Sequence, residues 1–260
     1  MRQLSRNSPV TPAEELAVGN SRRLFQVGEL EQNLAALRAW NLKFEIPDVI
    51  SFADFLHSRR LVAESLFSSQ RLLIWDRALR FPYPNGRKLR ELVVLEPPDL
   101  ALLRASAGRI VRPVKRRLSS RSFGYRTTQS GLAWQFDDTG AGWKRFTDSA
   151  IRLLQRGDIN AMCATDIASY YGSIDPDRLE TRLHDLGCDL HAVAVVLSGL
   201  RKWVSVDGIA GVPIGPEASG ILGNAFLIPV DRMLTSLGVE HVRGMDDYKL
   251  MGRDEPVGLS

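Results

Sequence analysis

Apolar residues recur at helical spacing in the first part of the chain. Over residues 28–40 they lie three or four positions apart, which predicts an amphipathic helix. A second helical pattern covers residues 52–80. We therefore expect an N-terminal helical extension over residues 1–80.

The pattern changes near residue 82. The segment Pro82-Tyr83-Pro84-Asn85-Gly86 combines two prolines with an Asn-Gly pair and predicts a turn. The apolar run that follows predicts a strand over residues 89–95. A pair of prolines then opens a predicted helix over residues 100–118, and another helix is predicted over residues 143–156.

The C-terminal part mixes strand and helix patterns. In chain order we expect a short buried strand (161–166), a helix from Asp175-Pro176, an apolar helix (190–203), a hairpin (204–209), a glycine and proline loop (211–216), a long buried helix (217–237) and a strand, turn and strand (240–251). This order predicts an α+β fold in which helices back an antiparallel sheet.

The composition is that of an ordinary globular chain. Of its 260 residues, 44% are hydrophobic and 25% are charged. No apolar run reaches the roughly 18–20 residues of a membrane helix, and the N-terminus lacks the apolar core of a signal peptide. We therefore expect a cytoplasmic protein without a membrane partner. Cys163 and Cys188 have no disulfide or metal-site spacing, so we expect buried free thiols.

The net charge of +4 is unevenly distributed. Residues 87–126 carry 11 basic and 3 acidic side chains, whereas residues 127–260 carry 12 basic and 18 acidic ones. The basic block predicts a surface that binds a polyanion, with a solvated helix face as the alternative.

Three carboxylates have positions that suggest chemistry. Asp166 ends an apolar strand, and the pair Asp246-Asp247 stands at a predicted turn. An Asp pair in a turn is most often turn chemistry, because Asp accepts hydrogen bonds from nearby amides. Strands that bring carboxylates to one end of a sheet also hold pairs of divalent ions for phosphoryl transfer. Magnesium suits such oxygen ligands.

Five segments occur in order within residues 80–252: Asn85-Gly86-Arg87-Lys88-Leu89-Arg90, Ser122-Phe123-Gly124-Tyr125-Arg126, Asp166-Ile167-Ala168-Ser169-Tyr170-Tyr171-Gly172-Ser173-Ile174, Gly211-Val212-Pro213-Ile214-Gly215-Pro216-Glu217-Ala218-Ser219 and Gly244-Met245-Asp246-Asp247. Together they resemble bacterial reverse transcriptases, the group that includes group II intron, retron and phage-defence enzymes. In that family they are a finger hairpin, a finger segment, the first palm motif, the loop before the long palm helix, and the aromatic-x-Asp-Asp turn.

The resemblance implies a right-hand polymerase with fingers over residues 81–160 and a palm over residues 161–260. The chain ends 13 residues after Asp247, so we expect no thumb, or a thumb supplied by a protein partner or second chain. The implied activity is RNA-directed DNA polymerisation, in which a nucleotidyltransferase adds dNTPs to the 3′-hydroxyl of a DNA or RNA primer on an RNA template. A retroelement or antiviral defence is the implied setting.

The resemblance also implies the catalytic residues. Asp166 and Asp246 are expected to bind two Mg²⁺ ions, with Mn²⁺ as an alternative, and Asp247 to lie alongside as a third carboxylate.

The nucleotide site is implied in the same way. Lys88 and Arg90 are expected to contact the triphosphate. Tyr171 is expected to exclude the ribose 2′-hydroxyl, and Gly215 and Ser219 to border the nucleotide. Template or duplex contacts are expected from basic side chains further along the chain, namely Arg109, Arg112, Lys115, Arg116, Arg117 and Arg121.

Two alternatives remain open. Gly244 stands where the family carries an aromatic residue, so the chain is alternatively a catalytically weak or inactive nucleic-acid-binding remnant of a reverse transcriptase. An RNA-dependent RNA polymerase is the other alternative. It is disfavoured by Tyr171, because those enzymes place an Asp at this position.

Overall fold

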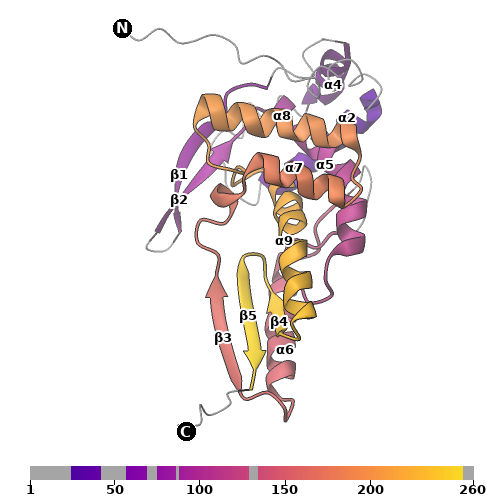
Figure 1. The fold of residues 1–260 in the computed structure, drawn as a ribbon. Coiled ribbons are helices and arrows are strands. Elements are labelled where there is room, and N and C mark those ends of the chain that lie inside the picture. The colour runs from indigo at the N-terminus through magenta and orange to yellow at the C-terminus, as the bar shows by residue number, and fades with distance from the viewer. Residues whose placement is uncertain (1–24, 42–56, 69–74, 86–87, 129–133, 254–260) are drawn as a thin grey trace.

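The computed structural model describes residues 25–41, 57–68, 75–85, 88–128 and 134–253. They form an α+β fold with two small antiparallel sheets (Figure 1). The elements are α2 (Val27–Asn41), α4 (Arg59–Ser68), β1 (Leu79–Asn85), β2 (Lys88–Val94), α5 (Pro97–Arg117), α6 (Thr139–Leu154), β3 (Ala161–Asp166), the 3₁₀ turn η2 (Tyr171–Ser173), α7 (Pro176–Asp185), α8 (Leu190–Asp207), α9 (Ala218–Ser236), β4 (Glu240–Arg243) and β5 (Asp247–Gly252). Within this part of the chain, no helix is both long and apolar enough to cross a membrane.

Helix α5 is the centre of the helical part. It packs against α2, α8 and α9, and every residue from Ala101 to Gly108 is buried. Two prolines occupy its first turn, where their missing N–H groups have no intrahelical partner to lose. The prediction of a helix after Pro97 is therefore confirmed.

Aspartate side chains begin three of the later helices. Asp138 caps α6 by accepting from the Gly140 N–H, Asp175 caps α7 through two N–H groups, and Asp189 caps α8 by accepting from the Ala192 N–H. These bonds satisfy backbone donors that the helix leaves open at its first turn.

The expected hairpin over residues 204–209 is wrong. Helix α8 continues to Asp207 and ends at Gly208, which has φ 68° and whose N–H donates to the Trp203 carbonyl. The β-branched residues Val204 and Val206 favour strands, but packing along α8 outweighs that weak preference.

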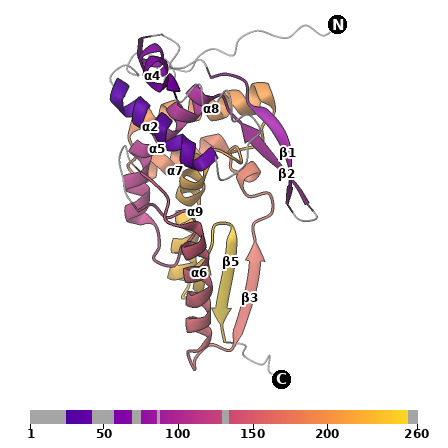
Figure 2. The same cartoon turned by 180° about the vertical axis from the view of Figure 1, so that it is seen from behind.

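The larger sheet has the strand order β3-β5-β4. Its β4 edge lies between two helices, with α9 in front in Figure 1 and α6 in front in Figure 2. Val242 of β4 and Met251 of β5 pack on Phe146 of α6. On the other face, Arg243 and Tyr248 contact Asp231 of α9.

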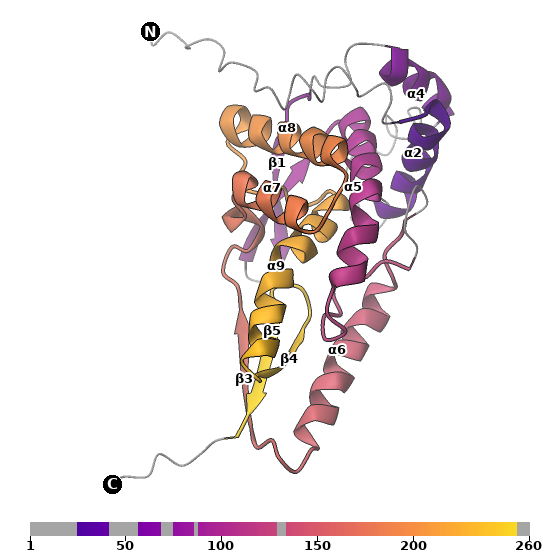
Figure 3. The same cartoon turned by 45° about the vertical axis from the view of Figure 1, so that its right-hand side comes forward.

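Strand β3 is the other edge of this sheet, and it is exposed from Met162 to Asp166. The strand was predicted correctly, but its burial was not. Because β3 lies two strands away from β4, neither α6 nor α9 covers it: in Figure 1 both helices lie on the β4 side of the sheet, and in Figure 3 α6 stands apart from β3. Cys163 is consequently exposed, against expectation, whereas Cys188 is buried as expected.

The smaller sheet is the hairpin of β1 and β2, in which Leu79 pairs with Val94 and Asn85 with Lys88. The strand expected over residues 89–95 is confirmed. The prediction of a helical pattern up to residue 80 is wrong at its C-terminal end, because Leu79 and Arg80 belong to β1. Prolines at positions 82 and 84 are tolerated there because β1 pairs on one side only.

A buried carboxyl group at the start of α5 predicts a pH-dependent stability. Burial raises the pKa of Asp99 to about 7, although its Oδ2 accepts a hydrogen bond from the Asp76 N–H. An Asp in an unfolded chain ionises near pH ~3.9. The raised pKa of Asp99 therefore makes its full contribution to the free energy of unfolding below that pH. The contribution is lost as the pH rises towards 7.

Asp99→Asn keeps an oxygen for the Asp76 N–H and removes the charge. Between pH 4 and pH 8, the free energy of unfolding of the wild type should fall by up to about 4 kcal/mol more than that of the variant. Urea unfolding at both pH values measures this difference, with the exposed Asp177→Asn as the control. Equal pH dependence in wild type and Asp99→Asn would contradict the prediction.

Candidate active site

The register of β3 and β5 brings the three predicted carboxylates to one end of the sheet. Asp166 pairs directly with Asp247 across the ladder. Asp246 precedes β5, and its carbonyl accepts a hydrogen bond from the Ile167 N–H at 3.2 Å. The Gly244 N–H donates to the Asp247 carbonyl at 2.8 Å and closes the turn. In Figure 1 this end of the sheet points towards the β1–β2 hairpin.

The three carboxylates influence one another electrostatically. Burial raises the pKa of the half-buried Asp246, and the negative charges of Asp166 and Asp247 raise it further. Arg90 on β2 acts in the opposite direction. The site therefore combines a concentration of negative charge, which a cation would stabilise, with an arginine from the hairpin.

These carboxylates do not form a closed metal cage. Within the described residues, no group of three or more His, Cys, Asp and Glu side chains is arranged to hold a metal ion by itself. Magnesium in nucleotide enzymes is typically bound through one or two carboxylates, with substrate phosphates and water completing its shell. The paired Asp166 and Asp247 beside Asp246 fit that open kind of site.

Tyr171 lies beside the carboxylates in the 3₁₀ turn that follows β3. Its ring is half-buried and stands 5.2 Å from the ring of Tyr170. The Tyr170 hydroxyl donates to the Gly223 carbonyl of α9 at 2.6 Å, which fixes the pair against that helix. Burial raises the pKa of Tyr171 well above its usual range, with further contributions from Tyr125, Tyr170 and Asp246.

The loop before α9 connects the Tyr171 turn to the β1–β2 hairpin. The Val212 N–H donates to the Tyr171 carbonyl at 2.9 Å, and the Val93 N–H donates to the Ile214 carbonyl at 2.6 Å. Gly215 approaches β2 so closely that a methyl group there would lie 2.7 Å from the Val93 oxygen. Gly215 therefore lies where strand and loop meet.

Ser219 has a different position from the one expected. Its side chain is buried, and its hydroxyl donates to the Pro213 carbonyl at 2.6 Å. This bond uses the one donor of the hydroxyl group. Ser219 therefore stabilises the loop that borders the site from within.

The two predicted triphosphate ligands lie on β2. Arg90 is exposed, and its charge acts on both Asp246 and Tyr125, so it belongs to the same electrostatic environment as the carboxylates. Lys88 pairs with Asn85 at the end of the hairpin. Its side chain lies outside the described part of the structure.

The six basic residues expected to contact nucleic acid extend along α5 and the loop after it, and do not gather at the carboxylates. Arg109 pairs with Glu29 at 2.9 Å and Arg121 with Glu240 at 2.7 Å. Lys115 donates to the Thr128 carbonyl and Arg117 to the Asp185 carbonyl, each at 2.8 Å. The remaining two, Arg112 and Arg116, are exposed and make no hydrogen bond or ion pair with the described residues.

A buried polar network behind the carboxylates was not predicted. Arg243, the last residue of β4, is 0% exposed and donates to both oxygens of Asp231 on α9, at 2.9 and 2.8 Å. Its other guanidinium nitrogen donates to the Asn224 side chain and to the Met245 carbonyl, both at 3.0 Å. The Tyr248 hydroxyl donates to Asp231 at 3.1 Å. The network therefore ties α9 to the turn that carries Asp246.

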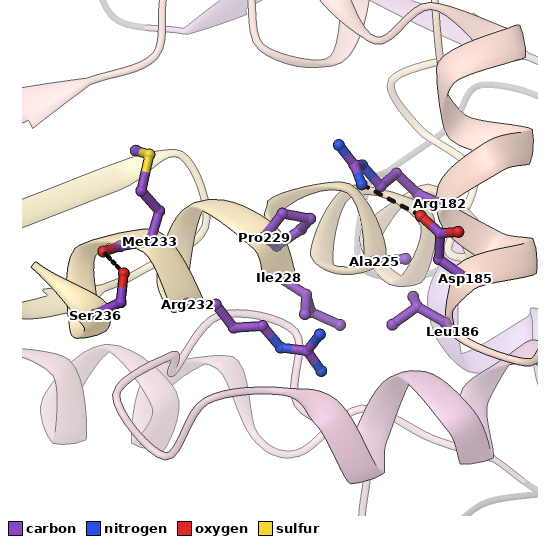
Figure 4. Close-up of a pocket in the computed structure, with 9 residues that line it drawn as sticks. All are labelled: Arg182, Asp185, Leu186, Ala225, Ile228, Pro229, Arg232, Met233 and Ser236. Carbon is purple, nitrogen blue, oxygen red and sulfur yellow. Dashed lines mark hydrogen bonds and ion pairs between the residues drawn. The ribbon is translucent and has the colours of Figure 1, made fainter.

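A separate hollow of about 400 Å³ lies between α7 and α9 (Figure 4). Ile228, Leu186, Arg182 and Arg232 are among the residues that line it. None of the residues predicted for catalysis or nucleotide binding lines it. The candidate site is thus the open surface around the carboxylates, not this hollow.

Comparison with protein families and with curated proteins finds no match to this chain.

Proposed function

We propose that this protein is an RNA-directed DNA polymerase of the reverse transcriptase kind, a nucleotidyltransferase that adds dNTPs to a primer 3′-hydroxyl. The observation that carries the proposal is the β3–β5 register, which sets Asp166 opposite Asp247 and next to Asp246. The half-buried Tyr171 and the charge of Arg90 act at the same place. Carboxylates that hold divalent ions and an arginine that binds phosphate oxygens suit the joining of a nucleoside triphosphate.

In this proposal the larger sheet with α9 is the palm, and the β1–β2 hairpin is part of the fingers. The hydrogen bond between Val93 and Ile214 supports the assignment, because it connects the hairpin directly to the loop beside Tyr171. An incoming nucleotide would then lie between the hairpin and the carboxylates.

In this proposal the residues of the site have different chemical roles. Asp166, Asp246 and Asp247 would hold Mg²⁺, or Mn²⁺ in its place, and the ions would lower the pKa of the primer hydroxyl and neutralise charge on the phosphates. Arg90 would orient the triphosphate through its planar guanidinium group. Tyr171 would exclude the ribose 2′-hydroxyl. The bond to the α-phosphorus forms from the primer 3′-oxygen as pyrophosphate leaves.

The partners in this proposal are an RNA template and a DNA or RNA primer. Arg112 and Arg116 are the best placed of the basic side chains to contact a phosphate backbone, because neither is engaged by the described residues. Such contacts are independent of sequence and weaken with salt. A retroelement or antiviral defence in the cytoplasm is the setting we propose.

A nucleic-acid-binding protein without polymerase activity is the second candidate. Gly244 favours it, since it stands next to the carboxylates where the family that the chain resembles carries an aromatic side chain. This candidate keeps the basic residues of α5 and gives the carboxylates no chemical role.

Substitution of Tyr171 tests the nucleotide site. In Tyr171→Ala we expect the preference for dNTP over rNTP to fall by about 10- to 100-fold, since a space-filling contact in a pocket is worth roughly 1–3 kcal/mol. Competition between labelled dATP and ATP in primer extension measures the ratio. Tyr171→Phe, which keeps the ring, is the matched control. An unchanged ratio in Tyr171→Ala would count against Tyr171 as the residue that selects the sugar.

A further inference from the structure

Tyr125 has a backbone conformation that a bulky residue rarely adopts. Its φ is 47°, in the left-handed region. This conformation costs roughly 1–2 kcal/mol for a residue with a Cβ, and it persists only where surrounding contacts maintain it. Contacts with the surrounding structure must therefore hold Tyr125 in place.

Asn224 of α9 supplies those contacts. Its side-chain amide donates to the Gly124 carbonyl at 3.0 Å and to the Tyr125 carbonyl at 3.2 Å. Gly124 also lies directly on the turn that precedes Asp246, because a methyl group at Gly124 would stand 1.6 Å from the Gly244 oxygen. No larger residue fits between the two segments.

The other side of Asn224 is tied to the carboxylate turn. Its side-chain oxygen accepts a hydrogen bond from Arg243, and the same nitrogen of Arg243 donates to the Met245 carbonyl, both at 3.0 Å. The segment before Tyr125 is also bound to β4, since the Phe123 N–H donates to the Arg243 carbonyl at 2.8 Å. Asn224 thus joins the backbone of Tyr125 to the residue just before Asp246.

The Tyr125 ring extends from this anchor towards the site. It lies against Gly220 of α9 and meets Phe136 edge to face, with ring centroids 5.0 Å apart. Burial raises the pKa of the Tyr125 phenol, Asp246 raises it further and Arg90 lowers it. Tyr171 in turn is influenced by Tyr125. Tyr171 packs against α9 one turn further along, because a methyl group at Gly223 would lie 3.3 Å from its ring, so the two tyrosines lie next to each other along α9.

We infer that Tyr125 is a specificity-determining residue that forms a second wall of the nucleotide site next to Tyr171, and that Asn224 is the positioning residue that holds it there. The inference rests on the proposed polymerase function and adds two residues to its nucleotide site. Its structural basis is the left-handed Tyr125, the double hydrogen bond from Asn224 and the link through Arg243 to Met245.

The first test removes the ring and keeps the backbone. Asn adopts the left-handed region more readily than other residues with a side chain, so Tyr125→Asn preserves the conformation without the wall. In primer extension we expect KM for dNTP to rise about tenfold with kcat within about threefold, which is the loss of binding that a positioned contact supplies. Tyr125→Phe keeps the ring and should restore a KM near that of the wild type.

The second test removes the anchor and keeps the ring. Asn224→Asp retains an oxygen for Arg243 and loses both donors to Gly124 and Tyr125. We expect a similar rise in KM. If Asn224 acts through Tyr125, Asn224→Asp should add nothing when Tyr125 is already Asn, because the two changes remove one interaction.

Val196→Ala is the control for a general loss of stability. This core change on α8 should destabilise the fold without changing KM. Binding of dATP is followed in parallel through the shift in unfolding temperature, which needs no catalysis. An unchanged KM and an unchanged dATP shift in Tyr125→Asn, or additive effects of the two substitutions, overturn the inference. A wild-type chain that neither binds nor incorporates dNTP overturns the polymerase function itself.

Discussion

Arg243→Met should lower the free energy of unfolding by about 3–5 kcal/mol, because it leaves a buried carboxylate without its partner. Arg243 is 0% exposed and Asp231 is 1% exposed, so no water can replace the lost contacts. The Asn224 side chain and the Met245 carbonyl also lose a donor. Urea unfolding followed by tryptophan fluorescence measures the change.

A surface arginine provides the matched control for this prediction. Arg201 pairs with Asp177 at 2.7 Å and Glu180 at 2.6 Å, and its side chain is 32% exposed. Arg201→Met should therefore cost less than about 1 kcal/mol. Combining Arg243→Met with Asp231→Leu should recover part of the loss, since both charges are then gone. If Arg243→Met costs no more than Arg201→Met, the network does not hold the carboxylate turn.

Asp246→Asn should reduce dNTP incorporation by at least about 1,000-fold, a barrier increase of roughly 4 kcal/mol. Asn has the same shape as Asp but lacks the charge that would bind a divalent cation. The fold should not suffer, because burial and the charges of Asp166 and Asp247 already raise the pKa of Asp246 and so disfavour its ionised form. Incorporation of labelled dATP measures the first effect, and urea unfolding measures the second.

Asp148→Asn is the control for this prediction, because among the described residues Asp148 pairs with the exposed Lys144 one turn away on α6. It should leave incorporation within about twofold of the wild type. Retention of more than a tenth of wild-type incorporation by Asp246→Asn would mean that Asp246 holds no essential ion.

Most elements could be predicted from local pattern, because helical periodicity, Asp caps and glycine positions are local signals. The predictions failed where contacts between residues far apart in the sequence determine the structure. Strand β1 contains two prolines and exists because β2 pairs with it. The exposure of β3 depends on strand order, which no short pattern encodes.

In the candidate site, too, some features could be predicted from the local sequence and others could not. The position of Asp166 at a strand end and of Asp246-Asp247 at a turn predicted their meeting, and the β3–β5 register agrees. The anchor of Tyr125 could not be predicted, because Asn224 lies 100 residues from Gly124 and 19 residues from Arg243. The spacing of Arg243 and Asp231 along the sequence does not show that the two side chains are buried and paired. Their pairing is decided when α9 packs on β4. The Ser219 hydroxyl was likewise assigned to a ligand although its partner is the Pro213 carbonyl.

Extension of a labelled DNA primer on an RNA template by the purified wild-type chain, with Mg²⁺ and the four dNTPs, tests the central claim most directly. We predict products that lengthen with time, whose sequence is complementary to the template, and that are absent with Asp246→Asn. Binding of the primer and template that weakens with salt, without any extension, would contradict the polymerase function and favour the nucleic-acid-binding alternative.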